Sequence, residues 1–368
     1  METIKAVLII SPFFHPNIGG VETHLTDLTK ELSKKYKVFV QTYSPLTTAN
    51  TTWQKIEKFK NLTIYRHHWF GKNLFHTLEK YSILQFLYLT PYLFLHSFVW
   101  MLQNHKKISI IHSHGFNAAF IGHYLSKIFN KKHIISTHAI YDHLKPSPIL
   151  LKLINQSHIT LTLSDASKKQ LIAWGANNNK LSTYKYWIDL DIFKPVAVKN
   201  KKFTILFVGR LIQKKGVKIL VKIAQKLPSI NFTFIGTGPL ENYLESISKK
   251  YKNIKFLGKI NNKFLPKYCS QSHLLCVPSL YQEGFGRVVM ESVACGTPVL
   301  ASNLGGLPEA LDNTVSILIK PTLNNLSASI LKLYQNKNIY NKLSHHCRPY
   351  AISNFSSKNI FLITKYYD

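Results

Sequence analysis

Short apolar runs alternate along the whole chain with longer stretches in which apolar residues recur at helical spacing. This alternation is typical of the strands and helices of a parallel sheet. In the first half it predicts strands at 4–10, 38–42, 62–65, 109–112, 133–136 and 159–163, with helices such as 21–33 and 117–129. In the second half it predicts strands at 203–208, 231–235, 254–257, 274–277 and 299–301, with helices at 217–226, 240–251 and 286–294.

The two series of strands are separated by a stretch at 193–202, FKPVAVKNKK, which contains Pro195 and is the predicted linker. We therefore predict an α/β protein with two doubly wound parallel sheets, in domains at 1–195 and 196–349. A C-terminal helix at about 350–368 is expected to pack back on the first domain. Ligands of open α/β sheets bind beyond the carboxyl ends of the strands, so the loops there are where functional residues are expected.

The charge of the chain is strongly positive, +30, with 47 Lys and Arg against 17 Asp and Glu. It is spread over both halves and favours anionic partners. The chain has no zinc-finger spacing, basic-zipper heptads or aromatic ribonucleoprotein motif, so no nucleic-acid partner is expected. The four cysteines show neither metal-ligand nor disulfide-framework spacing, and the N-terminal apolar run is interpreted as a strand, not a signal peptide. We expect a cytoplasmic location.

The stretch 83–102, ILQFLYLTPYLFLHSFVWML, carries no formal charge and is long enough to cross a bilayer as a helix. Pro91 in its middle argues against an unbroken helix. Three interpretations stay open: a buried core helix, a helix in the membrane interface and a true span. Aromatic residues within the stretch and flanking lysines favour the interface. These lysines are Lys72, Lys80, Lys106 and Lys107.

The segment VGRLIQKKG at 208–216 places Arg210 and Lys215 between a predicted strand and the helix that follows. Two cations beside a helix N-terminus form an anion site, because the free backbone N–H groups add to the side-chain charges. Arg occurs only four times in this chain, and its guanidinium binds phosphate bidentately. We predict a diphosphate site at Arg210 and Lys215. Gly236 and Gly238, in IGTGP after the next strand, are weaker candidates for contact with a base or ribose.

The most informative segment is EGFGRVVMESVACGTPVLASNLGGLPE at 283–309. Glu283 and Glu291 are seven residues apart, with Gly284, Phe285 and Gly286 at the expected start of a helix. Carboxylates accept hydrogen bonds from sugar hydroxyls, and the amides at a helix start suit phosphate. A capping glutamate followed by an ordinary surface glutamate is the alternative, which the scarcity of acidic residues in this half weakens.

The first half contains three further features that can be compared with known kinds of site. Gly19 and Gly20 lead from a strand into a helix and form a loop that can approach an anion or a sugar. His138 follows a predicted strand and is a candidate for contact with a sugar, whereas His112 and His114 are rated lower. The sequence Asp189-Leu190-Asp191 has the D-x-D form of a metal site but lies far from the phosphate motifs, and no metal is expected.

Together these segments resemble glycosyltransferase family 4, retaining enzymes of the GT-B fold that use nucleotide sugars. The similarity runs from SPFFHPNIGGVETH through STHAIYDH and LSDASKKQL to VGRLIQKKG, FIGTGPL and the 283–309 segment. It implies two Rossmann-like domains facing a central cleft. One departure is Tyr186-Trp187, where many relatives have Asn-Gly.

The resemblance also implies roles for the candidate residues. Arg210 and Lys215 would bind the donor diphosphate, Glu291 the ribose and Glu283 the transferred sugar, near the amides of Phe285 and Gly286. The Gly19-Gly20 loop would face donor and acceptor, and His138 would contact the sugar near the reacting carbon.

We therefore expect metal-independent, retaining transfer of a hexosyl group from a UDP- or GDP-sugar to a hydroxyl of a lipid-linked or glycan acceptor. The catalytic residues would be His138, Glu283, Arg210 and Lys215. The stretch 83–102 and the basic surface suggest peripheral contact with the inner face of the cell membrane. The alternatives are a GT-B-like nucleotide-sugar epimerase and a basic nucleic-acid-binding protein.

Overall fold

The chain forms two compact units in the computed structural model, which describes residues 5–48, 51–71, 74–78, 80–138, 140 and 147–367. The first unit comprises residues 1–185 together with 358–368, and the second comprises 186–357. The division therefore falls ahead of the predicted linker at 193–202. The segment from Lys358 onward belongs to the first unit.

The first unit is built on an eight-stranded sheet in the order β3-β4-β2-β1-β5-β6-β7-β8. All neighbouring pairs are parallel except β3 and β4, so the sheet is mixed, whereas an all-parallel sheet was predicted. The exception arises because the short edge strand β3 reaches β4 through a tight turn, in which Phe59 N donates to Leu62 O at 2.7 Å. The strands are β1 (Ala6–Ile10), β2 (Lys37–Tyr43), β3 (Ile56–Lys58), β4 (Leu62–His67), β5 (Ile108–His114), β6 (Lys132–Ser136), β7 (Ile159–Thr162) and β8 (Leu181–Thr183).

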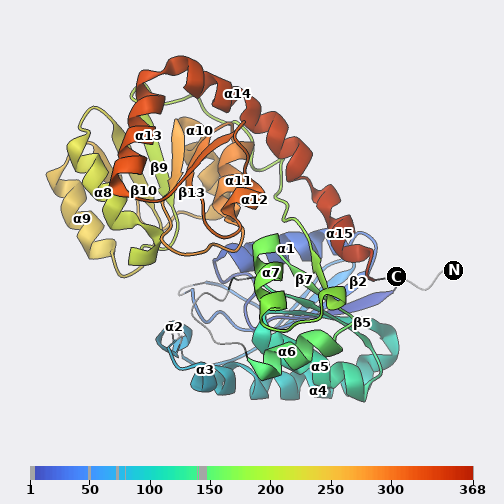
Figure 1. Ribbon diagram of the computed structural model, residues 1–368. Coiled ribbons are helices and arrows are strands. Elements are labelled where there is room, and N and C mark those ends of the chain that lie inside the picture. The colour runs from blue at the N-terminus through green and yellow to red at the C-terminus, as the bar shows by residue number, and fades with distance from the viewer. Residues whose placement is uncertain are drawn as a thin grey trace. The chain divides into compact units, whose positions relative to one another are not determined.

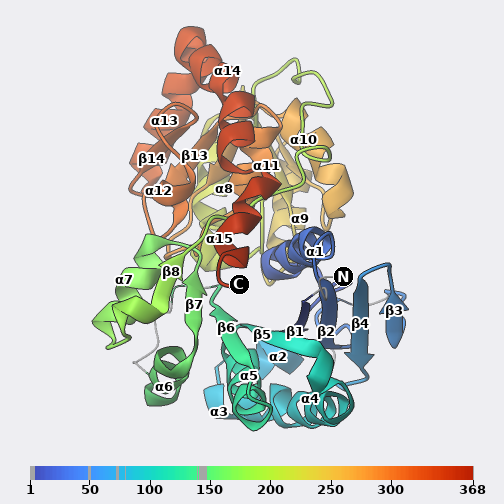
Figure 2. The same ribbon diagram turned by 90° about the vertical axis from the view of Figure 1, so that its right-hand side faces the viewer.

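Helices cover both faces of this sheet, with α4 and α5 on one face and α1 on the other (Figure 2). In α1 the buried residues Leu25, Leu28 and Leu32 recur at helical spacing, which explains why this segment folds against the sheet. The helices are α1 (Gly20–Leu32), α2 (Leu74–Leu78), α3 (Ser82–Leu89), α4 (Pro91–Asn104), α5 (Phe116–Ile128), α6 (Pro148–Gln156), α7 (Asp165–Ala173) and α15 (Phe361–Thr364), with 3-10 turns at His105–Lys107, Asn178–Lys180 and Ser357–Ile360.

The second unit is built on a six-stranded parallel sheet in the order β11-β10-β9-β12-β13-β14. Figure 1 labels β9, β10 and β13 of this sheet and the helices around it. The strands are β9 (Thr204–Val208), β10 (Asn231–Ile235), β11 (Ile254–Phe256), β12 (Leu274–Val277), β13 (Val299–Ser302) and β14 (Ser316–Ile319). The helices are α8 (Val217–Lys226), α9 (Glu241–Lys250), α10 (Leu265–Gln271), α11 (Arg287–Ala294), α12 (Leu307–Ala310), α13 (Leu323–Gln335) and α14 (Lys337–Asn354), with 3-10 turns at Gln213–Lys215 and Asn262–Phe264. The main core lies where α8 and α13 pack on β9 and β10.

Each sheet has a point at which its strand order reverses. In the second unit this point lies between β9 and β12, and in the first unit between β1 and β5. Two loops that leave a parallel sheet in opposite directions open a crevice at its carboxyl edge, and ligands of doubly wound sheets bind there. The loops after β9 and β12, and those after β1 and β5, are therefore the places to look for a site.

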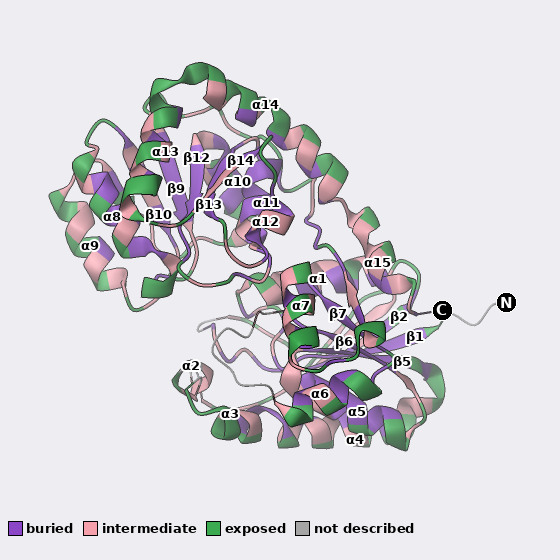
Figure 3. Ribbon diagram, in the orientation of Figure 1, coloured by how far each residue is buried: buried purple, intermediate pink, exposed green. Residues whose placement is uncertain are grey.

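The apolar stretch 83–102 forms two helices, α3 and α4, which meet at Thr90 and Pro91. One face belongs to the core, where Leu89, Leu93 and Met101 are buried. The other face carries large apolar side chains that are about half exposed or more, and both helices include exposed residues in Figure 3. These side chains are Ile83, Leu84, Leu87, Leu95, Val99 and Leu102. By length and composition alone Ser82–Lys107 could cross a membrane, although 28% of the apolar window is buried inside the protein.

Candidate active site

The loop after β9 carries two cationic side chains, one exposed and one engaged in an ion pair. The side chain of Arg210 is exposed and forms no ion pair or hydrogen bond with any residue that the structure describes. Lys215, at the end of the 3-10 turn Gln213–Lys215, is half-buried, and its Nζ lies 2.5 Å from Glu283 Oε1. Arg210 is therefore available to an external anion, whereas Lys215 is already engaged.

The loop after β12 delivers Glu283 to the same place. Its side chain is buried, and Ser279 Oγ donates to the same oxygen, Oε1, that contacts Lys215. Because both side-chain contacts use Oε1, Oε2 can accept a hydrogen bond from a ligand such as a sugar hydroxyl. The structure thus brings the predicted residues Arg210, Lys215 and Glu283 together at the point where the second sheet changes direction.

Burial and charge act in opposite directions on the groups around this pair. Burial by itself lowers the pKa of Lys215, but the Glu283 carboxylate and Tyr281 together outweigh this effect, and the net pKa is raised. Burial raises the pKa of Tyr281, whose ring lies 5.4 Å from Lys215 Nζ, and the lysine charge opposes this effect. The lysine is therefore charged and the tyrosine neutral at physiological pH.

Glu291 forms an ion pair with Arg287. The helix α11 begins at Arg287, one residue after the predicted start, and Gly286 precedes it with φ +77°, a conformation that favours glycine. Arg287 Nε donates to Glu291 Oε1 at 3.0 Å, and both side chains are buried. The phenyl ring of Phe285 lies edge-on to Tyr186, with centroids 6.1 Å apart. Tyr186 and Trp187, the pair that departs from the usual Asn-Gly, are buried residues of this unit.

Gly236 and Gly238 serve the contact between two loops. A Cβ on Gly236 would lie 1.9 Å from Gly209 O, and one on Gly238 would lie 2.8 Å from Leu211 O. Leu211 N also donates to Thr237 O at 2.7 Å, which fastens the loops after β9 and β10 to each other. The glycines thus hold the segment around Arg210 in place, a role that the sequence did not distinguish from ligand contact.

Hydrogen bonds to other segments of the first unit hold the loop after β1 in place. Arg66 Nη2 donates to His15 O at 2.7 Å, and Asn17 Oδ1 accepts from the backbone N–H groups of Leu46 and Thr47 at 2.9 Å. Gly19 is extended and precedes α1, and a Cβ on Gly20 would meet no atom within 4 Å. A Cβ on Gly19 would lie 2.2 Å from Glu22 Oε2, so the open space lies at Gly20, the first residue of α1.

His138 lies two residues after the end of β6 and is hydrogen-bonded to His114, with His138 Nε2 and His114 Nδ1 3.0 Å apart. Burial lowers the pKa of His138 to about 3, so its ring is neutral at physiological pH. His114, which the sequence rated low, is thus part of the same arrangement. Residues 139 and 141–146, the rest of the STHAIYDH motif, lie outside the described part of the chain.

The D-x-D sequence forms a turn. Asp189 Oδ1 accepts from the backbone N–H groups of Asp191 and Ile192 at 3.0 and 3.3 Å. Among the described residues, no group of three His, Cys, Asp or Glu side chains is placed to hold a metal ion.

Two family models divide the chain between them. The model described as Glycosyltransferase Family 4 matches residues 18–192, and the one described as Glycosyl transferases group 1 matches 189–353. The chain belongs to glycosyltransferase family 4. Gly19, Gly20 and His138 lie within the first matched range, and Arg210, Lys215, Glu283 and Glu291 lie within the second.

Several known proteins are similar to this chain over most of its length. One component of the human phosphatidylinositol N-acetylglucosaminyltransferase is 26% identical over 341 residues, which cover 89% of this chain and 68% of the human protein. Sucrose-phosphate synthase of Thermosynechococcus elongatus has a TM-score of 0.79 at 20% identity and covers 98% and 97% of the two chains. The Anabaena protein HepE, solved with UDP-glucose, has a TM-score of 0.76 at 17% identity, with 98% of each chain covered. The GT-B fold of this glycosyltransferase is therefore confirmed.

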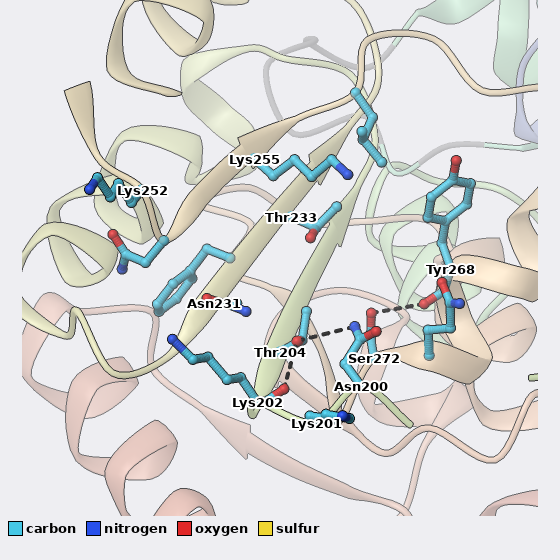
Figure 4. Close-up of a pocket in the computed structure, with 14 residues that line it drawn as sticks. Asn200, Lys201, Lys202, Thr204, Asn231, Thr233, Lys252, Lys255, Tyr268 and Ser272 are labelled. Carbon is cyan, nitrogen blue, oxygen red and sulfur yellow. Dashed lines mark hydrogen bonds between the residues drawn. The ribbon is translucent and has the colours of Figure 1, made fainter. Parts of the chain in front are cut away.

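A cavity of about 430 Å³ lies at the other end of the second sheet (Figure 4). Its lining includes Thr204 and Asn231, the first residues of β9 and β10, whereas Arg210 and Gly236 follow the last residues of these strands. The cavity is thus separate from the candidate donor site.

Sequence reasoning missed three side chains of the site. Ser279 and Tyr281 belong to the same loop as Glu283, and the side chain of Arg287 neutralises Glu291. The signal was present as polar residues directly after a buried strand and as one of only four arginines. Their partners could not be assigned from the sequence. The contact of Tyr281 connects two loops, that of Ser279 depends on the conformation of one loop, and that of Arg287 depends on where α11 begins.

Proposed function

We propose that this glycosyltransferase transfers a hexosyl group from a UDP- or GDP-sugar to a hydroxyl of a lipid-linked or glycan acceptor, with retention of configuration and without a metal ion. The observation that carries the donor assignment is the exposed, unengaged guanidinium of Arg210 beside the Lys215–Glu283 pair at the carboxyl edge of the second sheet. The complex of HepE with UDP-glucose supports a nucleotide sugar as donor.

One group of residues acts on the departing diphosphate, and another group binds the sugar and the ribose. Arg210 and Lys215 stabilise the negative charge that develops on the departing diphosphate, aided by the amides of Phe285 and Gly286. Glu283 Oε2 accepts from the hydroxyls of the transferred sugar, Glu291 from those of the ribose, and His138 contacts the sugar near C1. The bond from C1 to the diphosphate breaks as the acceptor oxygen bonds to C1 on the same face, and the acceptor proton leaves with the diphosphate.

The outward face of α3 and α4 supports a membrane-bound acceptor. Six large apolar side chains project from it, and the exposed lysines Lys80, Lys106 and Lys107 flank it. Apolar side chains with flanking cations fit the surface of an anionic membrane. The human relative is named for phosphatidylinositol, a membrane lipid. We therefore assign this face to the cytoplasmic surface of the membrane, and the other face of the helices to the core, where Leu93 and Met101 lie.

The donor assignment is tested by ligand-induced stabilisation. UDP-glucose, UDP-N-acetylglucosamine and GDP-mannose are added separately, and the donor used by the enzyme is expected to raise Tm, because a ligand that binds only the folded state stabilises it. Arg210→Ala should abolish this shift and most turnover. Lys214→Ala removes the same charge from an exposed neighbouring residue and should change neither.

Two results would contradict the proposal. Wild-type turnover by Arg210→Ala would remove the diphosphate role of this residue. Conversion of the donor sugar into an epimer without any acceptor would indicate an epimerase instead of a transferase.

A further inference from the structure

The carboxyl end of β5 and the start of the loop after β6 carry a connected group of histidines. His112 Nδ1 lies 2.7 Å from Tyr367 OH, and its Nε2 lies 2.8 Å from Ser136 Oγ. His114 is next on the same side of β5, with ring centroids of His112 and His114 4.2 Å apart. His114 in turn contacts His138, the residue proposed to lie near the reacting carbon.

The contact between His114 and His138 has the geometry of a hydrogen bond in the plane of both rings. The two nitrogens are 3.0 Å apart, the ring planes differ by 14° and the centroids are 5.2 Å apart. One of the two nitrogens must carry the proton and the other must accept it, since burial keeps both rings neutral.

The surroundings of His114 decide which nitrogen carries the proton. Its other nitrogen, Nε2, is buried and has no hydrogen-bond partner among the described residues. If His138 donated, His114 Nε2 would carry the ring's proton as a buried N–H group with no acceptor, and such orphaned donors are rare in folded proteins. If His114 Nδ1–H donates, the group left at Nε2 is a lone pair facing the interior.

We propose that His114 is a positioning residue that donates its Nδ1–H to His138 and so fixes His138 as the tautomer with the proton on Nδ1. The inference rests on the proposed function, because the importance of this tautomer comes from the proximity of His138 to the sugar. In this tautomer His138 Nε2 accepts the N–H of His114, and the single proton of the neutral ring is on Nδ1. His138 in this state is neither a base nor a cation.

The tautomer can be read without any assay of activity. In protein labelled with ¹⁵N-histidine, the ring nitrogen shifts distinguish protonated from unprotonated Nδ1 and Nε2, and the signals of His138 are assigned by their loss in His138→Asn. We expect His138 of the wild type to be protonated on Nδ1 and not on Nε2 between pH 6 and 8. A proton on Nε2, or a positive charge in this range, would overturn the inference.

Substitution of His114 separates positioning from packing. His114→Asn keeps an N–H donor near the position of Nδ1, whereas His114→Leu fills a similar volume without one. We expect His114→Leu to lower kcat about tenfold or more at little change in KM for the donor, and to mix the tautomers of His138. His114→Asn should recover most of kcat and the Nδ1 proton, and His346→Leu, at an exposed histidine on α14, should leave both unchanged.

The outcomes also separate this inference from the proposed function. Equal kcat for the Asn and Leu variants, with an unchanged tautomer of His138, would remove the role of His114. If instead no sugar nucleotide is turned over by the wild type, the proposed function fails while the ¹⁵N shifts still decide the tautomer. If His114→Leu does not fold, the wild type and His114→Asn are sufficient for the decision.

Discussion

Arg210 and Lys215 have the same charge and follow the same strand, but among the described residues Lys215 forms an ion pair and Arg210 forms none. An exposed side chain without partners adds little to stability, and the loss of one is usually within ±0.5 kcal/mol. Removing a cation from a buried pair leaves an uncompensated carboxylate, which costs about 3 kcal/mol. The two residues should therefore differ in stability effects although both are proposed to serve the diphosphate.

This difference leads to a paired prediction. Arg210→Ala should lose turnover at unchanged free energy of unfolding, whereas Lys215→Ala should lose both. Chemical denaturation and a transfer assay on the same preparations provide the comparison, with Lys214→Ala as the control. Equal stability of all three variants would show that the contact between Lys215 and Glu283 contributes nothing to the fold.

Buried histidines predict that the first unit is sensitive to acid. Burial lowers the pKa of His112, His133 and His138 to about 3, and it lowers the pKa of His114 well below its ordinary value. Below the ordinary pKa of about 6.5 the unfolded chain binds protons that the folded chain does not. Stability should therefore fall as the pH is lowered from about 6.5 toward 3, by roughly 1.4 kcal/mol per pH unit for each such histidine.

Thermal unfolding between pH 4 and 8 measures this dependence. His133→Asn removes one of the four groups without touching His138, so its slope should be shallower than that of the wild type. A stability that is constant over this range would contradict the burial of these rings.

At the scale of single residues, the sequence identified those whose chemistry is unusual for this chain. Arg210 was conspicuous because arginine is scarce, and Glu283 because acidic residues are scarce in its half. His114 was a weaker candidate because the neighbours of a strand residue depend on the register of the sheet. Its partner His138 follows the neighbouring strand β6, and apolar spacing does not indicate this pairing. Pairings between loops, such as Lys215 with Glu283, depend on backbone conformations that apolar spacing does not specify.

Among the elements, α3 and α4 support the sharpest prediction. Leu95 and Val99 are 56% and 48% exposed and lie one helical turn apart, so replacing both by serine removes apolar surface from the outward face without opening the core. Flotation with vesicles should show that the wild type binds anionic vesicles better than neutral ones, and that the double variant binds weakly. Ile352→Ser on α14 is the control for loss of an exposed apolar side chain, and equal binding by all proteins would contradict the assignment of this face.

A second element, the turn after β10, supports a prediction about packing. Gly236→Ala should destabilise the second unit by more than 1 kcal/mol, in the range of about 1 to 3 kcal/mol, because φ is +141° and the new Cβ would overlap the carbonyl of Gly209. The position of Arg210 depends on the same contact, so affinity for the donor should fall as well. Calorimetry and donor titration check the two effects, with Gly258→Ala, where a Cβ meets no atom, as a control for the left-handed backbone.

Most of the long elements were predictable because their apolar spacing is regular. β10, β12 and α8 have the predicted bounds, and the other predicted strands agree to within a few residues. Three short strands were missed, β3, β8 and β14. They lie at the edges of the sheets, where three or four residues give too little alternation to distinguish a strand from a loop. The break between α3 and α4 was indicated by Pro91, but not which face of the helices would be buried.

In the whole molecule, the chain returns to the first unit at Lys358 after completing the second. Tyr367 anchors this return, since it is buried, lies against Tyr36 at 5.3 Å between ring centroids and contacts His112. Tyr367→Ala should destabilise the first unit by about 3 to 5 kcal/mol, as for other large buried aromatic side chains. Phe361→Ala, at an exposed position of the same segment, should have little effect.

Hydrogen exchange followed by mass spectrometry assigns this loss to a unit. In Tyr367→Ala, peptides from β5 and β6 should exchange faster, whereas those from β9 and β12 should not change. Faster exchange confined to the second unit would show that the C-terminal segment does not support the first.

The return of the chain also bears on the order of folding during synthesis. A domain formed by one continuous segment can fold once the ribosome has released it, but residues 1–185 lack the Tyr36 and His112 contacts of Tyr367 until 186–357 have been made. At about 5 to 20 residues per second this interval is roughly 10 to 30 seconds. During that time we expect the nascent first unit to expose apolar surface that the finished protein covers, and the second unit has the opportunity to fold first.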